Sequence, residues 1–531
     1  MSRRPHTLVQ RLINRAGKQP DKIAIHFKGR AITYGELQAT AAAMASGLHA
    51  LGIGSGDRVA LMLRNRPEYF ELSYAIWWIG AILVPVNVTF AEAEVRQTLA
   101  DSGASCCVAN GDLIEMVSRA RSGIESAKIL INADGSKEHC DLNLRELRAL
   151  APAPIVPAAP RADRLAIIAY TSGTTGVPKG AMLDDQHLAD GMDHLARYFG
   201  FGEEDNILQP FPVHAVNPCR IGTWFAINLG STAVLMERFD AGAVARAISK
   251  YRVAYFATVP TMLFDILKVE LDEPLNFSSL RYVLYGGAPT PPALRAELES
   301  RFGIRMIQSY GSTEVARISV DPIDSPPRPG SAGKVIECAE VTVRDQLGNI
   351  LRLGDIGEFW VRGAAKPDRW GFTFRPILGY WNDPEKSAEA LPDGWYRTGD
   401  MGYLDKDGWL YVVDRVKDML IRGGNNIYPA EIERVLQDDP RVESAYVVGL
   451  ADERLGQIPM AYIVPKAADS PVDVDDIVAA ANSKLAKIKR IERAELISSA
   501  DLPRNAMNKV LKRELAARAN PSAIGSIPAR T

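Results

Sequence analysis

The sequence Tyr170-Thr-Ser-Gly-Thr-Thr-Gly-Val-Pro-Lys-Gly180 decides the fold, because the rest of the chain can be ordered around it. An apolar run from Leu165 to Ala169 precedes it and is typical of a buried strand. Glycines let backbone N–H groups close on an anion, and hydroxyls donate hydrogen bonds to phosphate oxygens. Lys179 adds a mobile positive charge. The stretch therefore predicts a flexible loop that binds polyphosphate.

The Walker loop has a glycine, then any four residues, and then Gly-Lys-Ser/Thr. The spacing in this stretch is different. Here Gly173 and Gly176 are three apart, and Gly180 follows the lysine. A polar surface loop is the alternative, because Gly, Ser and Thr are common in loops. The stretch alone leaves that alternative open.

Length and composition narrow the class of protein. A chain of 531 residues with 47% apolar residues is long enough for more than one domain with sizeable cores. The net charge of -2 and the lack of a long basic run argue against a nucleic-acid partner. The most apolar segment, 74–86, is too short for a transmembrane span, and the start of the chain shows no signal peptide. Five cysteines without metal spacing fit a reducing, cytoplasmic location.

Helical and strand patterns alternate along the first 150 residues, which predicts parallel strands with helices between them. Thr33 and Glu36 form a predicted capping box at the start of a helix. A proline-rich connector over 151–162 then leads to the strand before the loop. Further predicted elements are a helix over 184–198 and strands over 253–259, 280–285 and 306–308. The fold class is α/β, with doubly wound sheets in a large N-terminal domain.

Short strands and hairpin signals over 321–440 predict a small antiparallel β unit inside that domain. Strands over 442–448 and 461–464 and helices over 474–487 and 509–518 predict a compact α+β lid. The predicted domains are residues 1–415 and 416–531, joined by a hinge at 414–418.

A second candidate site segment follows the predicted strand 306–308 and has the sequence Ser309-Tyr-Gly-Ser-Thr-Glu314. A tyrosine ring can stack on a purine, Thr313 can reach a phosphate, and Glu314 can hold Mg²⁺. A plain helix N-terminus, where acidic residues are common, is the alternative.

The stretch 170–180, the segment 309–314 and Thr398-Gly-Asp400 together resemble the signatures of the adenylate-forming superfamily. Nearly the whole chain takes part, with the signatures in the expected order. The resemblance implies an acyl-CoA synthetase that uses ATP, Mg²⁺ and coenzyme A. Such an enzyme activates a carboxylic acid as an acyl-adenylate, releases pyrophosphate, and transfers the acyl group to coenzyme A with release of AMP.

The resemblance also implies roles for individual residues. The residues expected to take part in catalysis are Lys509, Glu314, Thr175 and Lys179, with Glu314 as the Mg²⁺ ligand. The residues expected to bind the acid are His214 and Ser309. Nucleotide binding is expected of Thr171, Ser172, Gly173, Thr174, Thr175, Gly176, Lys179, Gly287, Ala288, Pro289, Ser309, Tyr310, Gly311, Ser312, Thr313, Asp400 and Arg415. In the lid, Lys417 is the expected hinge, and Gly423, Gly424 and Lys489 the coenzyme A contacts.

Several positions depart from the family pattern. Ala215 to Arg220 replaces the family's usual glycine-containing sequence after His214, which puts the choice of acid in doubt. Ser309 stands where a glycine is frequent, which disfavours a bulky or very long acid. Asn425 and Asn508 replace a glutamate and a glycine.

Two rival functions stay open on the sequence. One is an acyl-AMP ligase that loads a carrier protein, and the other is a nucleotide-binding sensor that has lost catalysis. The identity of the acid and the oligomeric state, a homodimer included, are not determined by the sequence.

Overall fold

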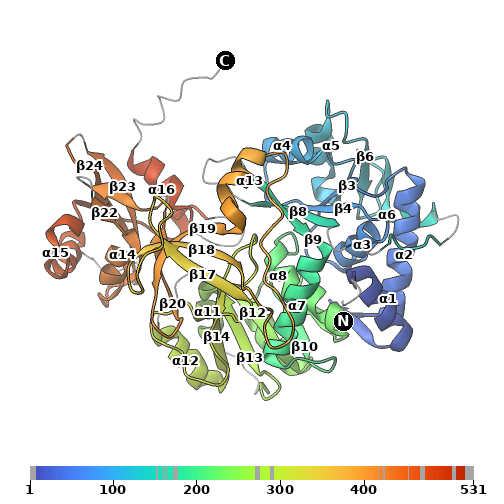
Figure 1. Ribbon diagram of the computed structural model, residues 1–531. Coiled ribbons are helices and arrows are strands. Elements are labelled where there is room, and N and C mark those ends of the chain that lie inside the picture. Colours follow the sequence, from blue (N-terminus) through green and yellow to red (C-terminus); the bar gives the residue numbers. More distant parts are fainter. Residues whose placement is uncertain are drawn as a thin grey trace. The chain divides into compact units, whose positions relative to one another are not determined.

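A computed structural model of the chain describes residues 7–150, 154–159, 161, 164–171, 178–269, 275–287, 292–416, 418–422, 425–452, 454–466, 473–504 and 510–520. The chain divides into two compact units (Figure 1). Unit 1 comprises Met1–Val341 and Val361–Tyr396, and unit 2 comprises Thr342–Trp360 and Arg397–Thr531. The boundary predicted at 414–418 stays a prediction.

Unit 1 contains two large sheets. The seven-stranded sheet has the order β7-β6-β5-β3-β4-β8-β9, and all its pairs except β8–β9 are parallel. Its strands are β3 (Arg58–Met62), β4 (Ile82–Pro85), β5 (Cys106–Ala109), β6 (Ile129–Asn132), β7 (Leu142–Asn143), β8 (Leu165–Thr171) and β9 (Lys179–Asp184). The predicted parallel α/β architecture is confirmed here.

The nine-stranded sheet has the order β16-β15-β14-β13-β12-β10-β11-β1-β2. Its strands are β1 (Ile23–Phe27), β2 (Arg30–Thr33), β10 (Asn206–Gln209), β11 (Ala233–Leu235), β12 (Val253–Thr258), β13 (Tyr282–Gly286), β14 (Arg305–Tyr310), β15 (Ser319–Val320) and β16 (Lys334–Val335). Strands β1, β10, β11, β12, β13 and β14 run parallel, while antiparallel β2 and β15–β16 form its edges.

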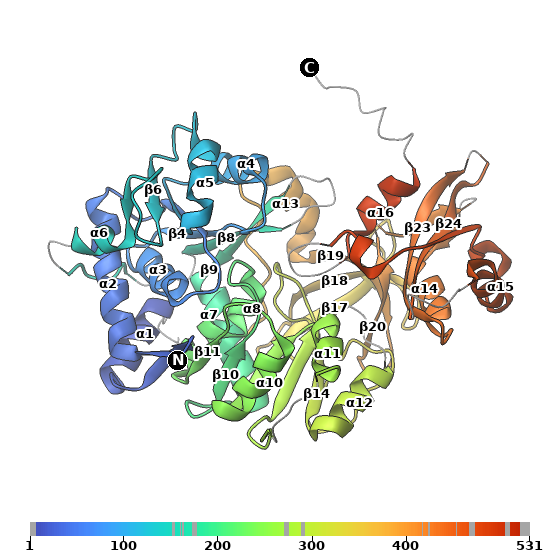
Figure 2. The same cartoon turned by 180° about the vertical axis from the view of Figure 1, so that it is seen from behind.

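Helices cover these sheets with apolar faces. The helices of unit 1 are α1 (Leu8–Lys18), α2 (Tyr34–Ala50), α3 (Pro67–Trp78), α4 (Glu92–Ser102), α5 (Ile114–Arg121), α6 (Leu144–Ala149), α7 (Asp185–Phe199), α8 (Val216–Arg220), α9 (Thr223–Leu229), α10 (Ala241–Lys250), α11 (Pro260–Leu267), α12 (Pro292–Phe302) and α13 (Pro384–Ala390). Figure 2 shows α10, α11 and α12 beside the strands of the nine-stranded sheet, where Ile248, Leu263 and Leu298 share one core with Phe256 and Val283.

Local sequence sets the start of these helices. The predicted capping box is present, since the Thr33 side chain accepts from the Glu36 N–H and the Glu36 carboxylate accepts from the Thr33 N–H. The proline-rich connector is tied to α3, because Trp78 Nε1 donates to the Ile155 carbonyl at 3.0 Å. Among the helices that the structure describes, none has the length and apolar character needed to cross a bilayer.

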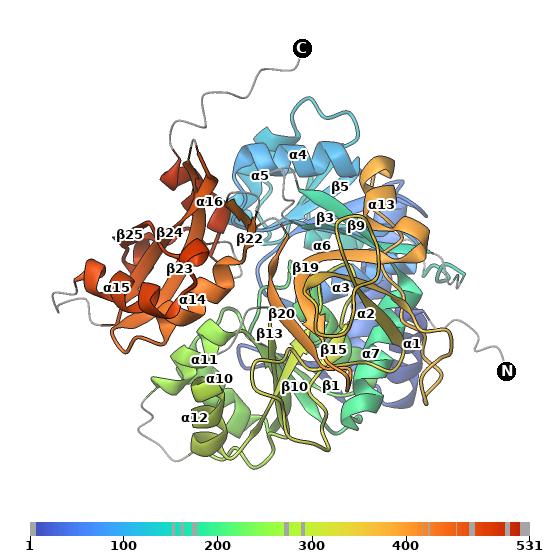
Figure 3. The same cartoon turned by 60° about the vertical axis from the view of Figure 1, so that its left-hand side comes forward.

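Unit 2 holds a five-stranded sheet with helices on both faces (Figure 3). The sheet consists of β21 (Leu420–Arg422), β22 (Asn425–Ile427), β23 (Val442–Asp452), β24 (Gly456–Pro465) and β25 (Arg493–Leu496). Helices α14 (Pro429–Gln437) and α15 (Val474–Lys484) pack against Ala461 and Ile463, and α16 (Lys512–Ala519) packs against Met460 and Tyr462. Successive side chains of a strand point to opposite faces, so β24 contributes to both cores.

A four-stranded sheet, β17-β18-β19-β20, forms from the short strands predicted over 321–440. Its strands are β17 (Ala339–Arg344), β18 (Gly357–Gly363), β19 (Tyr396–Leu404) and β20 (Leu410–Arg415). Strands β19 and β20 pair antiparallel across the predicted turn at 405–408.

Candidate active site

The predicted phosphate loop lies in a β-hairpin. Strand β8 carries the chain to Thr171, which pairs with Lys179 at the start of the antiparallel strand β9. The sequence analysis placed helix 184–198 directly after the loop and missed β9, because six residues of mixed polarity give no clear alternation. Five predicted nucleotide contacts lie outside the described residues, namely Ser172, Gly173, Thr174, Thr175 and Gly176. The hairpin nonetheless fixes both ends of the loop.

Three predicted side chains converge at the base of this hairpin. Thr171 Oγ1 donates to Glu314 Oε1 at 3.5 Å, and Tyr380 OH donates to the same oxygen at 3.4 Å. Lys179 Nζ lies 5.1 Å from the centre of the Tyr380 ring, within cation–π range. The backbone also holds this point, because the Ile377 N–H donates to the Glu314 carbonyl at 2.9 Å. Thr171, Lys179 and Glu314 therefore share one site in unit 1.

Tyr380 is the residue of this site that the sequence analysis missed. The segment around it extends the sheet beside β9, since Met182 N–H donates to the Gly379 carbonyl and Trp381 N–H to the Gly180 carbonyl. Burial, followed by the charge of Glu314, raises the pKa of the Tyr380 hydroxyl. The hydroxyl is therefore a hydrogen-bond donor at neutral pH. A glycine-aromatic pair before the Asp383-Pro384 helix start was the available signal.

The segment 309–314 begins at the end of β14, as predicted. Gly311 has no room for a side chain, because an added Cβ would lie 1.8 Å from the Ala316 carbonyl oxygen. Ala316 itself has φ 56°, a left-handed conformation that a non-glycine residue rarely adopts. The tight loop contains three half-buried residues, Tyr310, Ser312 and Thr313, directly before Glu314 in the sequence. The Ser309 hydroxyl donates to the Ser319 carbonyl at 3.3 Å, so β15 fixes that side chain.

The neighbouring strand β13 ends at the predicted adenine turn. Gly286 pairs with Ser309, and a Cβ on Gly286 would lie 2.3 Å from the Ser309 carbonyl oxygen. Gly287 has φ 81°, which favours glycine. Ala288 and Pro289 lie outside the described residues. The two parallel strands thus bring the turn and the 309–314 segment to the same sheet edge.

His214 lies in a loop that is anchored on both sides. Val213 N–H donates to Asn65 Oδ1 at 2.8 Å, and the Cys219 thiol donates to the Val213 carbonyl at 3.0 Å. Burial lowers the pKa of His214 to about 4, so the ring is neutral at pH 7. Its Nε2 atom is buried, and no described residue forms a hydrogen bond with it. The departure after His214 is short helix α8, which ends at buried Arg220.

In unit 2, the predicted ribose ligands are paired with each other. Asp400 and Arg415 face each other across β19 and β20, and Arg415 Nε lies 2.8 Å from Asp400 Oδ1. Asp400 N–H donates to Thr398 Oγ1 at 3.1 Å, which links the two ends of the Thr-Gly-Asp signature.

Most predicted residues of the lid lie outside the described residues, namely Lys417, Gly423, Gly424 and Lys509. The segment that contains Lys509 is closed at its base, because Arg504 and Val510 form a β-bridge and Leu511 N–H donates to the Pro503 carbonyl. Lys489 is described, and its ammonium group forms an ion pair with Glu431. The predicted coenzyme A contact is therefore already engaged by a carboxylate.

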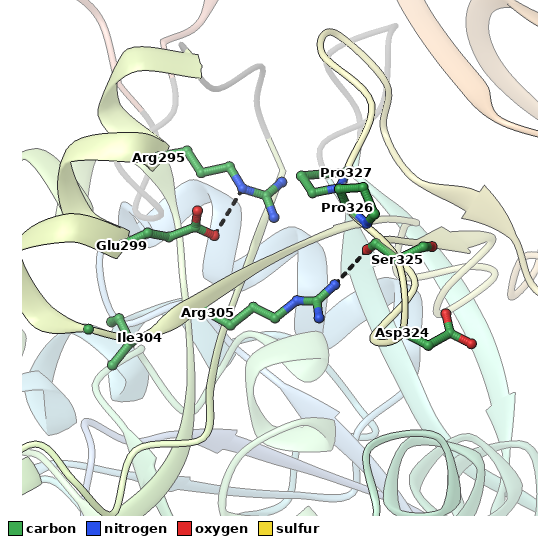
Figure 4. Close-up of a pocket in the computed structure, with 9 residues that line it drawn as sticks. Arg295, Glu299, Ile304, Arg305, Asp324, Ser325, Pro326 and Pro327 are labelled. Carbon is green, nitrogen blue, oxygen red and sulfur yellow. Dashed lines mark hydrogen bonds and ion pairs between the residues drawn. The ribbon is translucent and has the colours of Figure 1, made fainter.

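A cavity of about 700 Å³ lies elsewhere in unit 1 and contains none of the predicted site residues (Figure 4). Arg295 in its wall forms ion pairs with Asp321 at 2.7 Å and Glu299 at 3.2 Å. Arg305 donates to the backbone carbonyls of Pro322, Ile323 and Ser325. Both guanidinium groups are thus engaged by the protein's own carboxylates and backbone carbonyls.

Comparisons with known proteins agree with this arrangement. Residues 12–366 match the family model described as AMP-binding enzyme, and residues 431–509 match the AMP-binding enzyme C-terminal domain. The chain is 34% identical to a feruloyl-CoA synthase of Amycolatopsis sp, over 95% of this chain and 98% of that protein. It is 33% identical to an indoleacetate–CoA ligase of Aromatoleum aromaticum, over 95% and 97% of the two chains.

A solved structure matches over the full architecture as well. The o-succinylbenzoate CoA synthetase of Bacillus subtilis, in complex with its acyl-adenylate intermediate, has a TM-score of 0.82 and 30% identity. The match covers 97% of this chain and 98% of that one. The chain therefore belongs to the AMP-binding enzymes of the adenylate-forming superfamily, and it is an AMP-forming ligase that joins a carboxylic acid to coenzyme A.

Proposed function

We propose that Thr171, Lys179 and Glu314 form the phosphate end of the active site. The observation that carries this proposal is their convergence at the hairpin base, where Glu314 accepts from Thr171 and Tyr380 while Lys179 lies over the Tyr380 ring. A cation and hydroxyl donors on one side of a carboxylate suit a polyphosphate bound with a metal ion.

Glu314 is the residue that would hold Mg²⁺. The donor set fits, because Mg²⁺ takes carboxylate and hydroxyl oxygens and is usually completed by substrate phosphates and water. Both side-chain hydrogen bonds to Glu314 Oε1 are long, at 3.5 and 3.4 Å, so that oxygen is weakly engaged by the protein. When bound, the ion would neutralise the charge of the phosphates.

In the first half-reaction a carboxylate oxygen of the acid attacks the α-phosphorus of ATP. A P–O bond forms, the bond to pyrophosphate breaks, and an acyl-adenylate results. Negative charge on the phosphoryl oxygens is stabilised by fixed donors and cations, here Thr171, Thr175, Lys179 and, from the lid, Lys509. The ribose hydroxyls are assigned to Asp400 and Arg415, and adenine to the turn at Gly287 and the ring of Tyr310.

In the second half-reaction the predicted lid, residues 416–531, rotates about Lys417, which removes Lys509 and presents the Gly423-Gly424 backbone. The sulfur of coenzyme A attacks the acyl carbonyl and the thiol proton leaves. The C–O bond to phosphate then breaks, and AMP is released. Lys489 is proposed to meet a phosphate of coenzyme A.

The acid is proposed to bind beside His214 and Ser309. Relatives named for ferulate and indoleacetate support an aryl or aliphatic acid of moderate size. The five free cysteines support a reducing, cytoplasmic location. The oligomeric state stays open, and no observation favours a carrier protein over coenzyme A as acceptor.

Replacing Lys509 with alanine tests the two-step assignment. With the best acid of a panel, we expect ATP–pyrophosphate exchange to fall by about 1,000-fold, because a cation on the α-phosphate is lost. Thioester formation from pre-formed acyl-adenylate should change by less than about threefold. Lys466→Ala, an exposed lysine of unit 2, is the matched control. Normal exchange in the Lys509 variant would falsify the assignment, and ATP binding without exchange on any acid would favour a sensor.

A further inference from the structure

One face of helix α7 carries a polar layer that the proposed chemistry does not use. His187, Gly191 and His194 are spaced by four and three residues, so they lie on the same face of the helix. A Cβ built on Gly191 would meet no described atom within 4 Å. The helix therefore has open space between two histidines, both of which are buried.

Each of these histidines contacts an arginine from a different loop. Arg220, at the end of α8, lies with its Nη1 2.9 Å from His187 Nε2 and donates through Nη2 to Asn217 Oδ1 at 2.8 Å. Arg317 lies with its Nη2 3.5 Å from His194 Nδ1. Its Nη1 is buried, and no described residue forms a hydrogen bond with it. Arg220 is only 3% exposed.

Arg317 is held in place by a chain of polar contacts. Asp368 Oδ2 lies 3.3 Å from His194 Nε2, with the Asp368 side chain fully buried. Burial and the charge of Arg317 lower the pKa of His194 to about 3, so the ring is neutral. Asp368 Oδ2 forms no hydrogen bond with any described residue, and His194 Nδ1 accepts from the Arg317 guanidinium when the ring carries its proton on Nε2. The rings of Tyr198 and Phe199 lie 5.9 Å from Arg317 Cζ.

These two guanidinium groups have no direct carboxylate partner among the described residues. Neither Arg220 nor Arg317 forms an ion pair with any residue that the structure describes, and Asp368 reaches Arg317 only through a histidine. Burial, and then the charge of Arg317, lower the pKa of Arg220 to about 9. Buried charges are normally paired, because an unpaired one is costly.

A metal site is the competing explanation for part of this cluster. Single ligand atoms of His194, Cys338 and Asp368 lie within 4.8 Å of one another and are buried. A second cation at this position would face Arg317, which contacts His194 directly. The Cys338 thiol would also have to lose its proton, although burial raises its pKa to about 12. The layer therefore fits an anion better than a metal ion.

The layer is continuous in sequence with the proposed active site. Arg317 follows Glu314 by three residues in the loop closed by Gly311, and Arg220 lies in the loop that begins at His214. Helix α7 starts directly after β9, the strand that begins at Lys179. Both arginines therefore lie on segments that also carry residues of the proposed active site.

We propose that Arg220 and Arg317 bind a second anionic group of the acid, so that the substrate is a dicarboxylic acid. This inference rests on the proposed function, because it names the class of acid for the same site. One carboxylate reacts with ATP, and the other supplies the negative charge that the two arginines lack. Bidentate pairing with a carboxylate is the geometry for which guanidinium groups are best suited.

Matched pairs of acids test the inference. Succinate, glutarate, adipate and phthalate are each compared with the corresponding monomethyl ester in ATP–pyrophosphate exchange. For the diacid of the right length we expect kcat/KM at least about 100-fold above that of its ester, because a site built for a charged group rejects the analogue that lacks it. Equal or better use of the esters would overturn the inference while leaving adenylation intact. Exchange with no acid of any kind would instead count against the proposed function.

The variant Arg317→Met separates a binding role from a structural one. We expect kcat/KM for the diacid to fall about 100-fold and that for the monoester to rise, while the melting temperature without ligand stays equal or increases. Arg317→Lys, which keeps the charge, should recover part of the diacid activity. Arg238→Met, an exposed arginine, should change nothing. Unchanged diacid preference in Arg317→Met, or a lower melting temperature with both acids affected alike, would overturn the proposal.

Discussion

Two arginine-rich regions of unit 1 differ in how their charge is balanced. In the cavity of Figure 4, Arg295 is paired with Asp321, and Arg305 is bonded to three backbone carbonyls. In the layer on α7, Arg220 and Arg317 contact neutral histidines and form no ion pair with the described residues. The cavity belongs to the first region, whereas the arginines without an ion-pair partner among the described residues belong to the second.

The difference indicates which charges stabilise the fold and which are kept for a ligand. A buried arginine with its own carboxylate is costly to remove, because the partner is then left unpaired. An arginine without such a partner contributes little to stability and can bind an anion from outside. Four further experiments test this distinction and are ordered from the largest expected effect to the smallest.

The largest effect is expected for Glu314→Gln, because we propose that the Glu314 carboxylate is kept for a ligand. Exchange of pyrophosphate into ATP should fall by about 1,000-fold, or about 4 kcal/mol, because the proposed metal ligand is lost. The free energy of unfolding should change by less than about 1 kcal/mol, since the side chain makes two long hydrogen bonds. Urea denaturation and exchange assays measure both, with exposed Glu237→Gln as control. A large loss of stability would contradict the distinction.

The opposite outcome is expected for Arg295→Met, because the Arg295 guanidinium is paired with a buried carboxylate and stabilises the fold. The substitution leaves Asp321, which is 1% exposed, without its ion-pair partner. The free energy of unfolding should fall by about 3 kcal/mol, while kcat/KM changes by less than about threefold. Arg238→Met serves as the matched control in the same urea titrations. A stable protein with reduced activity would show that the Figure 4 cavity has a role in catalysis.

A pH-dependent effect is expected at Glu71, which forms an ion pair with Arg148 at 2.7 Å. Burial raises the pKa of Glu71 to about 7, although Arg148 lowers it in part. A raised pKa means that the folded state holds its proton more tightly, so stability is full below pH 4.5 and decreases as pH rises toward 7. Glu71→Gln cannot ionise and should gain about 2 kcal/mol over the wild type between pH 5 and pH 7.

The measurement is the free energy of unfolding of both proteins at the two pH values. Asp112→Asn, at an exposed ion pair with Arg64, is the control and should show no such trend. A constant difference between wild type and Glu71→Gln across this range would show that Arg148 fully compensates the buried carboxylate.

The smallest effect is expected at Lys489 in unit 2, which is paired with Glu431 and yet proposed to bind coenzyme A. Lys489→Met should raise the KM for coenzyme A about fivefold, or about 1 kcal/mol, because an exposed phosphate contact is weak. Exchange of pyrophosphate should stay normal, as should that of Lys466→Met. An unaltered KM for coenzyme A would show that Lys489 stabilises the fold through its ion pair with Glu431 and does not bind coenzyme A.

Local sequence patterns predict the order of most elements and the chemistry of the signature stretches 170–180 and 309–314. The capping box at Thr33 and Glu36 and the buried strand before Thr171 follow from local rules of hydrogen bonding and hydrophobic patterning. The resemblance to the adenylate-forming superfamily implied one site for Thr171, Lys179 and Glu314, and these side chains lie close together in the structure.

Only the tertiary structure decided which other residues join them. Tyr380 lies 66 residues from Glu314 in sequence, and its contact depends on a segment that pairs with β9. Arg220 and Arg317 become a pair because two loops meet on one face of α7, where each contacts a histidine. Residue type and spacing report local preferences, whereas the balance of buried charge depends on long-range packing that no short window of sequence contains.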